Sequence, residues 1–228
     1  NYLELKKELH DINFKTSSDT EVLYQWLIRF GTSRLNELSG MFSFCFYDNI
    51  TKDVLLVRDQ LGIKPLYYKI ENKSLSFCSE VRGLREIIEL DEGIDKNFIS
   101  HYLNLGYNLE PFTGFKNIFK IFPGSYLKFN IQTKSQIKKQ YWSPLNITNP
   151  SKIGISQKIF NSIKNHLISD VPVGVFYSGG VDSSLIATQI PKNSKFLISK
   201  SSRKELKSAG IIDDNYYAQK ISKKLNFK

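Results

Sequence analysis

Residues 177–187, YSGGVDSSLIA, change abruptly from apolar to small and polar side chains. The apolar run that ends at Tyr177 is typical of a strand, and the apolar positions from Leu185 onward indicate a helix. A turn of small residues between a strand and a helix brings unpaired backbone N–H groups to the positive end of the helix dipole. The pattern therefore predicts an α/β unit with an anion-binding turn.

The side chains of this turn suit the phosphates of a nucleotide. Gly179 and Gly180 let the backbone approach a phosphate closely. Hydroxyl donors come from three serines, Ser178, Ser183 and Ser184. Asp182 would repel a phosphate unless a cation lay between them, so we expect Mg²⁺ to bind at Asp182 together with the nucleotide.

Three other turns of this kind do not match the sequence. A Walker A loop requires a lysine that does not follow Gly180, and a nucleophile elbow around Ser178 requires glycine where Phe176 stands. The dinucleotide-binding pattern GxGxxG is absent from the sequence. A glycine turn that merely caps a helix is the structural alternative.

The remaining sequence predicts two domains, residues 1–144 and 145–228, joined by the proline- and asparagine-rich stretch SPLNITNPSK. In the first, TSSDTEVLYQWLIRFG predicts a helix with a capping box from Ser18 and Glu21 and a C-cap at Gly31. GMFSFCFYD alternates as a strand with its phenylalanines on the buried face. In the second, a helix begins near Ile155, and VPVGVFY predicts a strand buried on both faces.

Composition excludes several classes of function. No apolar run is long enough to cross a membrane. The net charge of +10 is spread along the chain, which argues against a nucleic-acid interface. Cys45 and Cys78 lack metal-ligand spacing, so we expect a buried structural role for each and a reducing, cytoplasmic location.

The turn SGGVDSS, preceded by NHLISDVPVGVFY, resembles the pyrophosphate-binding loop of ATP pyrophosphatases and the start of the synthetase domain of glutamine-dependent asparagine synthetases. Six further segments resemble the glutaminase domain of that family in the same order: YLELKKEL, FKTSSDTEVL, LSGMFSFCFYD, RDQLGIKPLYY, FCSEVRGL and IFPGSYL. The resemblance implies an α+β N-terminal-nucleophile (αββα) amidotransferase domain. The start of an α/β ATP-pyrophosphatase (adenine nucleotide alpha hydrolase-like) domain would follow it.

The same resemblance implies roles for particular residues. Asp19 matches the carboxylate that binds the α-amino group of glutamine, while Arg58 and Asp59 are not expected to be catalytic. The matches to the ATP site are Tyr177, Ser178, Gly179, Gly180, Asp182, Ser183, Ser184 and, at the adenine, Ile198.

The implied activity is that of a ligase, an ATP-dependent asparagine synthase that uses ammonia from glutamine and passes through β-aspartyl-AMP. Its substrates would be glutamine, aspartate and ATP with Mg²⁺, and a homodimer is left open as its assembly. One alternative is a related amidotransferase with a sugar acid or a specialised metabolite as acceptor. Another is a truncated, non-catalytic paralogue. A tRNA-modifying ATP pyrophosphatase is disfavoured, because such proteins lack the preceding glutaminase-like domain.

The chain departs from the family at both ends. The glutaminase reaction needs an N-terminal cysteine nucleophile, whereas residue 1 is Asn1, and the family's second acidic, glycine-rich loop has no counterpart after the turn. We therefore expect a chain truncated at both ends, without a catalytic nucleophile of its own. Release of glutamate from glutamine by these 228 residues would contradict that expectation.

Overall fold

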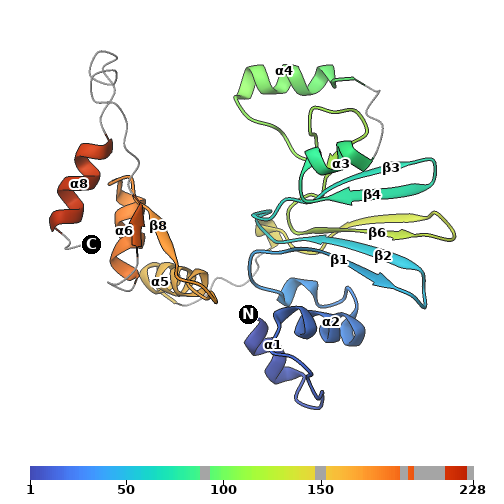
Figure 1. Ribbon diagram of the computed structural model, residues 1–228, viewed down its shortest axis with the longest axis horizontal. Helices are drawn as coiled ribbons and strands as arrows, with labels where there is room; N and C mark the ends of the chain where they lie inside the picture. Colours follow the sequence, from blue (N-terminus) through green and yellow to red (C-terminus); the bar gives the residue numbers. More distant parts are fainter. Residues whose placement is uncertain (88–92, 147–152, 191–194, 198–213, 225–228) are drawn as a thin grey trace. The chain divides into compact units, whose positions relative to one another are not determined.

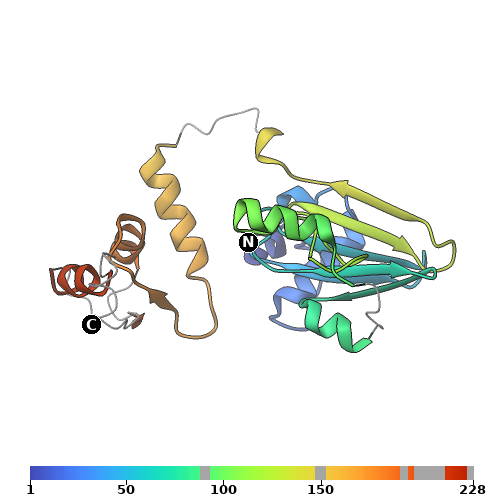
Figure 2. The same cartoon turned by 90° about the horizontal axis from the view of Figure 1, so that it is seen from above.

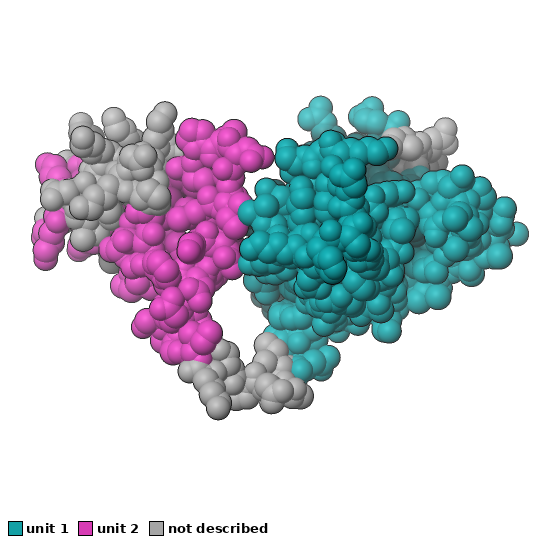
Figure 3. All heavy atoms as spheres, turned by 90° about the horizontal axis from the view of Figure 1, so that it is seen from below, with its two compact units in different colours: residues 1–148 teal, residues 149–228 magenta. Residues whose placement is uncertain are grey.

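The computed structural model describes residues 1–87, 93–146, 153–190, 195–197 and 214–224. The chain divides into two compact units, Asn1–Thr148 and Asn149–Lys228, which are coloured separately in Figure 3. In the described part of the chain, no helix is long and apolar enough to cross a membrane.

The first unit contains helices and two antiparallel sheets (Figure 1). Its helical elements are α1 (Tyr2–Glu8), α2 (Asp19–Phe30), the 3-10 turn η1 (Leu35–Glu37), α3 (Val81–Ile87), α4 (Lys96–Leu105) and the 3-10 turn η2 (Pro144–Asn146). Its strands are β1 (Ser43–Asp48), β2 (Asp53–Arg58), β3 (Tyr67–Glu71), β4 (Ser74–Cys78), β5 (Phe119–Lys120), β6 (Ser125–Asn130) and β7 (Gln136–Gln140). The four-stranded sheet has the order β1-β2-β6-β7, and the three-stranded sheet has the order β4-β3-β5.

Two apolar cores give the first unit its layers. Trp26 of α2 and Val57 of β2 are fully buried in the core between the helices α1 and α2 and the four-stranded sheet. Leu56 and Tyr68 belong to a second core, which lies between the two sheets. Because neighbouring side chains along β2 point to opposite faces of the sheet, Val57 packs in the first core and Leu56 packs in the second. Helix α3 contacts β3 and β4, so the order of layers is helix, sheet, sheet, helix (Figures 1 and 2).

The expected strand GMFSFCFYD, residues 40–48, is confirmed as β1 over Ser43–Asp48, and its phenylalanines pack on the core shared with α1 and α2. The expected burial of Cys45 is wrong, because this side chain is exposed, while Cys78 is half-buried. Cys45 lies on the face of β1 opposite the phenylalanines, and its register partner Leu56 marks that face as the one toward the second sheet. The alternation in β1 predicted which residues share a face but not whether a neighbour covers it.

Helix α2 begins and ends where the sequence predicts, with Ser18 as N-cap and Gly31 as C-cap. The capping box is wrong in one respect. Ser18 Oγ accepts a hydrogen bond from the Thr20 N–H at 3.1 Å, whereas the Glu21 carboxylate turns back to the N–H groups of Lys15 and Thr16. The helix therefore has a serine cap and a separate carboxylate that holds the preceding turn.

The second unit is an α/β segment. Its described elements are α5 (Ile155–His166), β8 (Gly174–Phe176), α6 (Val181–Gln189), β9 (Lys195–Leu197) and α8 (Asp214–Lys224). Strands β8 and β9 pair in parallel, as expected of a strand–helix–strand unit. The expected burial of β8 on both faces is wrong, since Phe176 is 84% exposed. Ile198 lies outside the described residues.

Candidate functional site

The first candidate site is the turn before α2, where Asp19 is the first helical residue. Asp19 is exposed, and its Oδ1 atom accepts hydrogen bonds from the hydroxyls of Thr20 at 3.3 Å and Ser18 at 3.4 Å. Among the described residues, no hydrogen bond reaches Oδ2 of Asp19. A carboxylate held on one oxygen and open on the other can accept an ammonium group.

Glu21 contributes to this turn in a way that the sequence did not reveal. Its carboxylate accepts hydrogen bonds from the Lys15 N–H at 2.8 Å, the Thr16 N–H at 2.6 Å and the Thr16 hydroxyl at 2.5 Å. The hydrogen bonds of Thr16 and Lys15 lower the pKa of Glu21 below its usual value, because they favour the charged form. The nearest signal in the sequence was the capping-box spacing, which identified the right acid but the wrong donors.

The second candidate site is the turn between β8 and α6. Helix α6 has Gly180 as its N-cap, and the Ser184 N–H donates to the Gly180 carbonyl at 3.0 Å. Within the part of the chain that the structure describes, the N–H groups of Val181, Asp182 and Ser183 have no hydrogen-bond acceptor. These groups lie at the positive end of the helix dipole, which is the arrangement that binds phosphate.

The hydroxyls predicted to bind phosphate are brought together by short contacts around this turn. Ser178 Oγ lies 3.0 Å from Ser183 Oγ, and the Gly180 N–H donates to Ser178 Oγ at 3.3 Å. Tyr177 is 2% exposed, and its hydroxyl lies 3.1 Å from Ser184 Oγ. The buried tyrosine therefore anchors one of the serines, while Ser178 and Asp182 remain exposed.

The two glycines of the turn have different surroundings. Gly179 has a φ of +78°, and a Cβ atom there would lie 2.5 Å from the backbone nitrogen of Ala218 in α8. Gly180 has extended backbone, and a Cβ atom would meet nothing closer than Ser178 Oγ at 3.4 Å. Gly179 thus lets α8 pack directly on the turn, in addition to any contact with a ligand.

Asp182 is the acidic residue in the first turn of α6. Among the described residues, no group of three or more His, Cys, Asp or Glu side chains could hold a metal ion. The single carboxylate of Asp182 fits a Mg²⁺ ion that is carried by a nucleotide, because such an ion usually takes one or two protein carboxylates and completes its shell with phosphates and water. It does not fit a metal site made by protein side chains alone.

Asp59, in the segment RDQLGIKPLYY, is fully buried. Its carboxylate accepts hydrogen bonds from the N–H groups of Leu61 at 3.2 Å, Ile63 at 2.9 Å and Lys64 at 2.9 Å. These bonds close the turn that leads from β2 in one sheet to β3 in the other. The carboxylate therefore serves the connection between the sheets.

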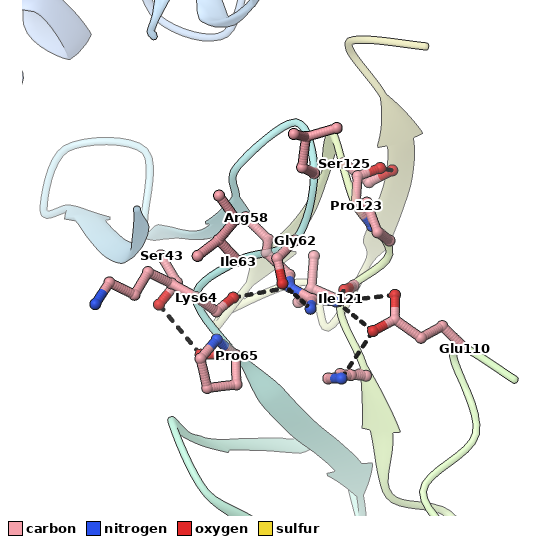
Figure 4. Close-up of polar contacts among 12 residues, drawn as sticks. Ser43, Arg58, Gly62, Ile63, Lys64, Pro65, Glu110, Ile121, Pro123 and Ser125 are labelled. Atoms are coloured by element: carbon pink, nitrogen blue, oxygen red, sulfur yellow. Dashed lines mark hydrogen bonds and ion pairs between the residues drawn. The ribbon is translucent and has the colours of Figure 1, made fainter. Parts of the chain in front are cut away.

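Arg58 is also buried and is held from several sides (Figure 4). Its Nε donates to the Lys64 carbonyl at 2.8 Å, and its Nη1 donates to the Ile121 carbonyl at 2.7 Å and to Glu110 Oε1 at 3.0 Å. Lys120 Nζ pairs with the same Glu110 oxygen at 2.7 Å. These contacts give Arg58 and Asp59 a structural explanation.

Two family models match the chain, one in each unit. The model of the glutamine amidotransferase domain matches residues 1–142, and that of asparagine synthase matches residues 154–228. The chain belongs to the glutamine-hydrolysing asparagine synthetase family. It carries a glutamine amidotransferase domain followed by the start of an asparagine synthase domain, in the order that the sequence motifs predict.

Individual relatives of the family agree over most of this chain. Asparagine synthetase [glutamine-hydrolyzing] 1 of Bacillus subtilis is 35% identical over 196 residues, which is 82% of this chain and 30% of the relative. Asparagine synthetase [glutamine-hydrolyzing] 2 of the same organism is 33% identical over 82% of this chain and 27% of its own length. The chain thus spans less than a third of either relative.

The match to a solved structure of glutamine phosphoribosylpyrophosphate amidotransferase from B. subtilis covers 93% of this chain and 49% of that protein's chain, at 15% sequence identity. Its TM-score of 0.41 is too low to bear on the fold.

Proposed function

We propose that the protein containing this chain is a glutamine-hydrolysing asparagine synthetase. It would make asparagine from aspartate, using ATP and the ammonia released from glutamine. The observation that carries the proposal is the turn at residues 178–184, where serine hydroxyls, one carboxylate and N–H groups without an acceptor among the described residues converge at the start of α6. Its place after a glutamine amidotransferase domain supports an amide-forming reaction that uses ATP.

The chemistry that we propose for the second unit has two steps. The β-carboxylate of aspartate attacks the α-phosphorus of ATP, and the bond to the bridging oxygen breaks, giving β-aspartyl-AMP and pyrophosphate. Ammonia then attacks the acyl carbon, AMP leaves, and asparagine forms. The N–H groups at the start of α6 would stabilise the charge that builds on the departing pyrophosphate. The further donors would be Ser178, Ser183 and Ser184, with Gly179 and Gly180 giving the backbone access.

Three residues complete the proposed nucleotide site. Asp182 would hold Mg²⁺ against the phosphates, and the metal would supply positive charge that offsets the negative charge of ATP. Tyr177 would orient Ser184 through the hydroxyl contact already described. Ile198 would contact the adenine ring, as the resemblance to the family implies.

In the first unit, Asp19 would bind the α-ammonium group of glutamine through its open carboxylate oxygen. We assign residues 1–144 to an N-terminal-nucleophile amidotransferase domain, and residues 145–228 to the beginning of an ATP-pyrophosphatase domain. Small-molecule substrates, a cytoplasmic location and the absence of a nucleic-acid or membrane partner complete the proposal.

The test is an asparagine synthesis assay with the protein expressed at the full length of its open reading frame. We expect asparagine to form from aspartate, glutamine and Mg·ATP, with one pyrophosphate released per asparagine. D182N should lower this rate about 100-fold, the scale on which a charge-stabilising group acts in an active site.

The matched control is T188A, which removes an exposed hydroxyl of α6 that donates to the Leu185 carbonyl at 2.7 Å and accepts a hydrogen bond from Gln189 Nε2 at 3.1 Å. It should leave the rate unchanged. Aspartate-independent release of pyrophosphate, or equal rates for D182N and T188A, would overturn the proposal.

A further inference from the structure

The turn that precedes Asp19 is held by polar contacts alone. Every residue from Lys15 to Thr20 is exposed, so burial does not set the conformation of this segment. The Glu21 carboxylate binds the backbone N–H groups of Lys15 and Thr16 at 2.8 and 2.6 Å. The acid thereby ties the start of the turn to the first turn of α2.

A second set of contacts connects Glu21 to Asp19. The Thr16 hydroxyl donates to Glu21 Oε2 at 2.5 Å and accepts a hydrogen bond from the Ser18 N–H at 3.2 Å. The Ser18 hydroxyl in turn lies 3.4 Å from Asp19 Oδ1, to which it donates. Hydrogen bonds therefore connect Glu21 to Thr16 and Thr16 to the backbone of Ser18, whose side chain contacts the carboxylate of Asp19.

Asp19 needs such support because of its exposure. An ion pair at an exposed site is weak on its own, since water screens the charges and the side chains lose conformational freedom when they pair. A carboxylate already fixed in its binding orientation avoids part of that entropy cost. The Thr20 hydroxyl, at 3.3 Å from the same Oδ1 atom, holds it from the helix side.

We propose that Glu21 is a positioning residue for glutamine, which holds the turn at residues 15–18 so that Asp19 presents its free Oδ2 to the ligand's ammonium group. The inference rests on the proposed function, because it assumes that Asp19 binds glutamine. Glu21 itself touches the turn and not the ligand. Its role is distinct from a helix cap, because its bonds go to Lys15 and Thr16 rather than to the N-cap residue Ser18.

The test compares E21Q with the unaltered protein, both expressed at the full length of the open reading frame. A glutamine side chain has one acceptor oxygen in place of two and turns an NH₂ group toward N–H donors. We expect the KM for glutamine to rise about tenfold, the low end of the loss seen when the outer-shell partners of metal ligands are removed, with kcat nearly unchanged. Synthesis of asparagine from added ammonium should keep its rate, because it does not use glutamine.

Hydrogen exchange supplies a readout besides activity. The amides of Lys15 and Thr16 should exchange faster in E21Q than in the unaltered protein. The matched control is E8Q, which removes the charge of an exposed acid that pairs with Arg34 at 2.9 Å. E8Q should change neither the KM for glutamine nor these two amides.

The variant D19N separates this inference from the function on which it rests. If D19N leaves the KM for glutamine unchanged, the proposed glutamine site is wrong. If D19N raises this KM while E21Q speeds exchange without raising it, the positioning role alone is overturned. Should E21Q fail to fold, T16V decides the matter, because it breaks the link to Ser18 and retains both backbone bonds of Glu21. An unchanged KM for T16V would then overturn the role.

Discussion

Asp59 illustrates, at the scale of the residue, how a buried charge can belong to the fold rather than to a reaction. Its side chain is inaccessible, and three backbone N–H groups donate to its two oxygens. The nearby Tyr141 hydroxyl donates to the Arg58 carbonyl at 2.7 Å, and burial together with the charge of Asp59 raises the pKa of Tyr141. The Asp59 side chain is therefore part of the connection between the sheets.

The variant D59N should destabilise the first unit. An amide keeps one acceptor oxygen but turns an NH₂ group toward the Lys64 N–H, which loses its partner inside the protein. Hydrogen bonds to charged groups are worth about 1.5–3 kcal/mol each, so we expect the free energy of unfolding to fall by about that amount in urea titrations. D48N is the control. Like Asp59, Asp48 accepts hydrogen bonds from backbone N–H groups, in its case two, but it lies in a more exposed turn. Equal losses for the two variants would argue against the role of burial.

The contacts of individual residues could be predicted from the sequence only in part. The spacing of Ser18 and Glu21 indicated that both stabilise the start of α2, and Ser18 does cap it. The spacing could not reveal that Glu21 would bind Lys15 and Thr16, because the path of the turn before a helix depends on contacts that periodicity does not record. Cys45 shows a similar limit. The alternating pattern of β1 predicts on which face of the strand a side chain lies, but not whether other residues bury that face.

The turn between β8 and α6 packs against a third element, helix α8. The small buried cluster that they share consists of Tyr177, Ala187 and Ala218. The strand and the helices were predictable from apolar runs and helical spacing. The exposure of Phe176 was not predictable, because the described sheet has only the pair β8 and β9. The two-residue strand β5 is likewise too short to show an alternating pattern.

The paired variants G179A and G180A test this packing. At Gly179 a methyl group would meet the Ala218 backbone at 2.5 Å and would require a left-handed conformation, whereas at Gly180 neither obstacle exists. G179A should lower the stability of the second unit by about 1–3 kcal/mol, while G180A should stay within about 1 kcal/mol of the unaltered protein. Amide exchange of α8 reports the difference, since its protection should fall in G179A alone. Matching protection in the two variants would remove the packing explanation.

The chain as a whole consists of two compact units, and each contains one of the two candidate sites. The asparagine- and proline-rich stretch at residues 143–152 predicts a linker, and the structure divides the chain after Thr148. Both cores of the first unit are made by residues that precede the division. The order of the layers could not be read from alternation alone, because a residue such as Leu56 could face either a helix or a second sheet.

Residues 1–148 should therefore fold by themselves, with their two cores intact. The expected result is a single cooperative unfolding transition, with an enthalpy of about 0.7 kcal/mol per residue near 60 °C by calorimetry. L56A supplies the internal control, because Leu56 is fully buried between the two sheets. It should lower the free energy of unfolding by about 2–5 kcal/mol, and by the same amount in residues 1–148 as in the 228-residue chain. A gradual transition, or a loss on L56A that appears only in the 228-residue chain, would mean that the core between the sheets depends on residues beyond Thr148.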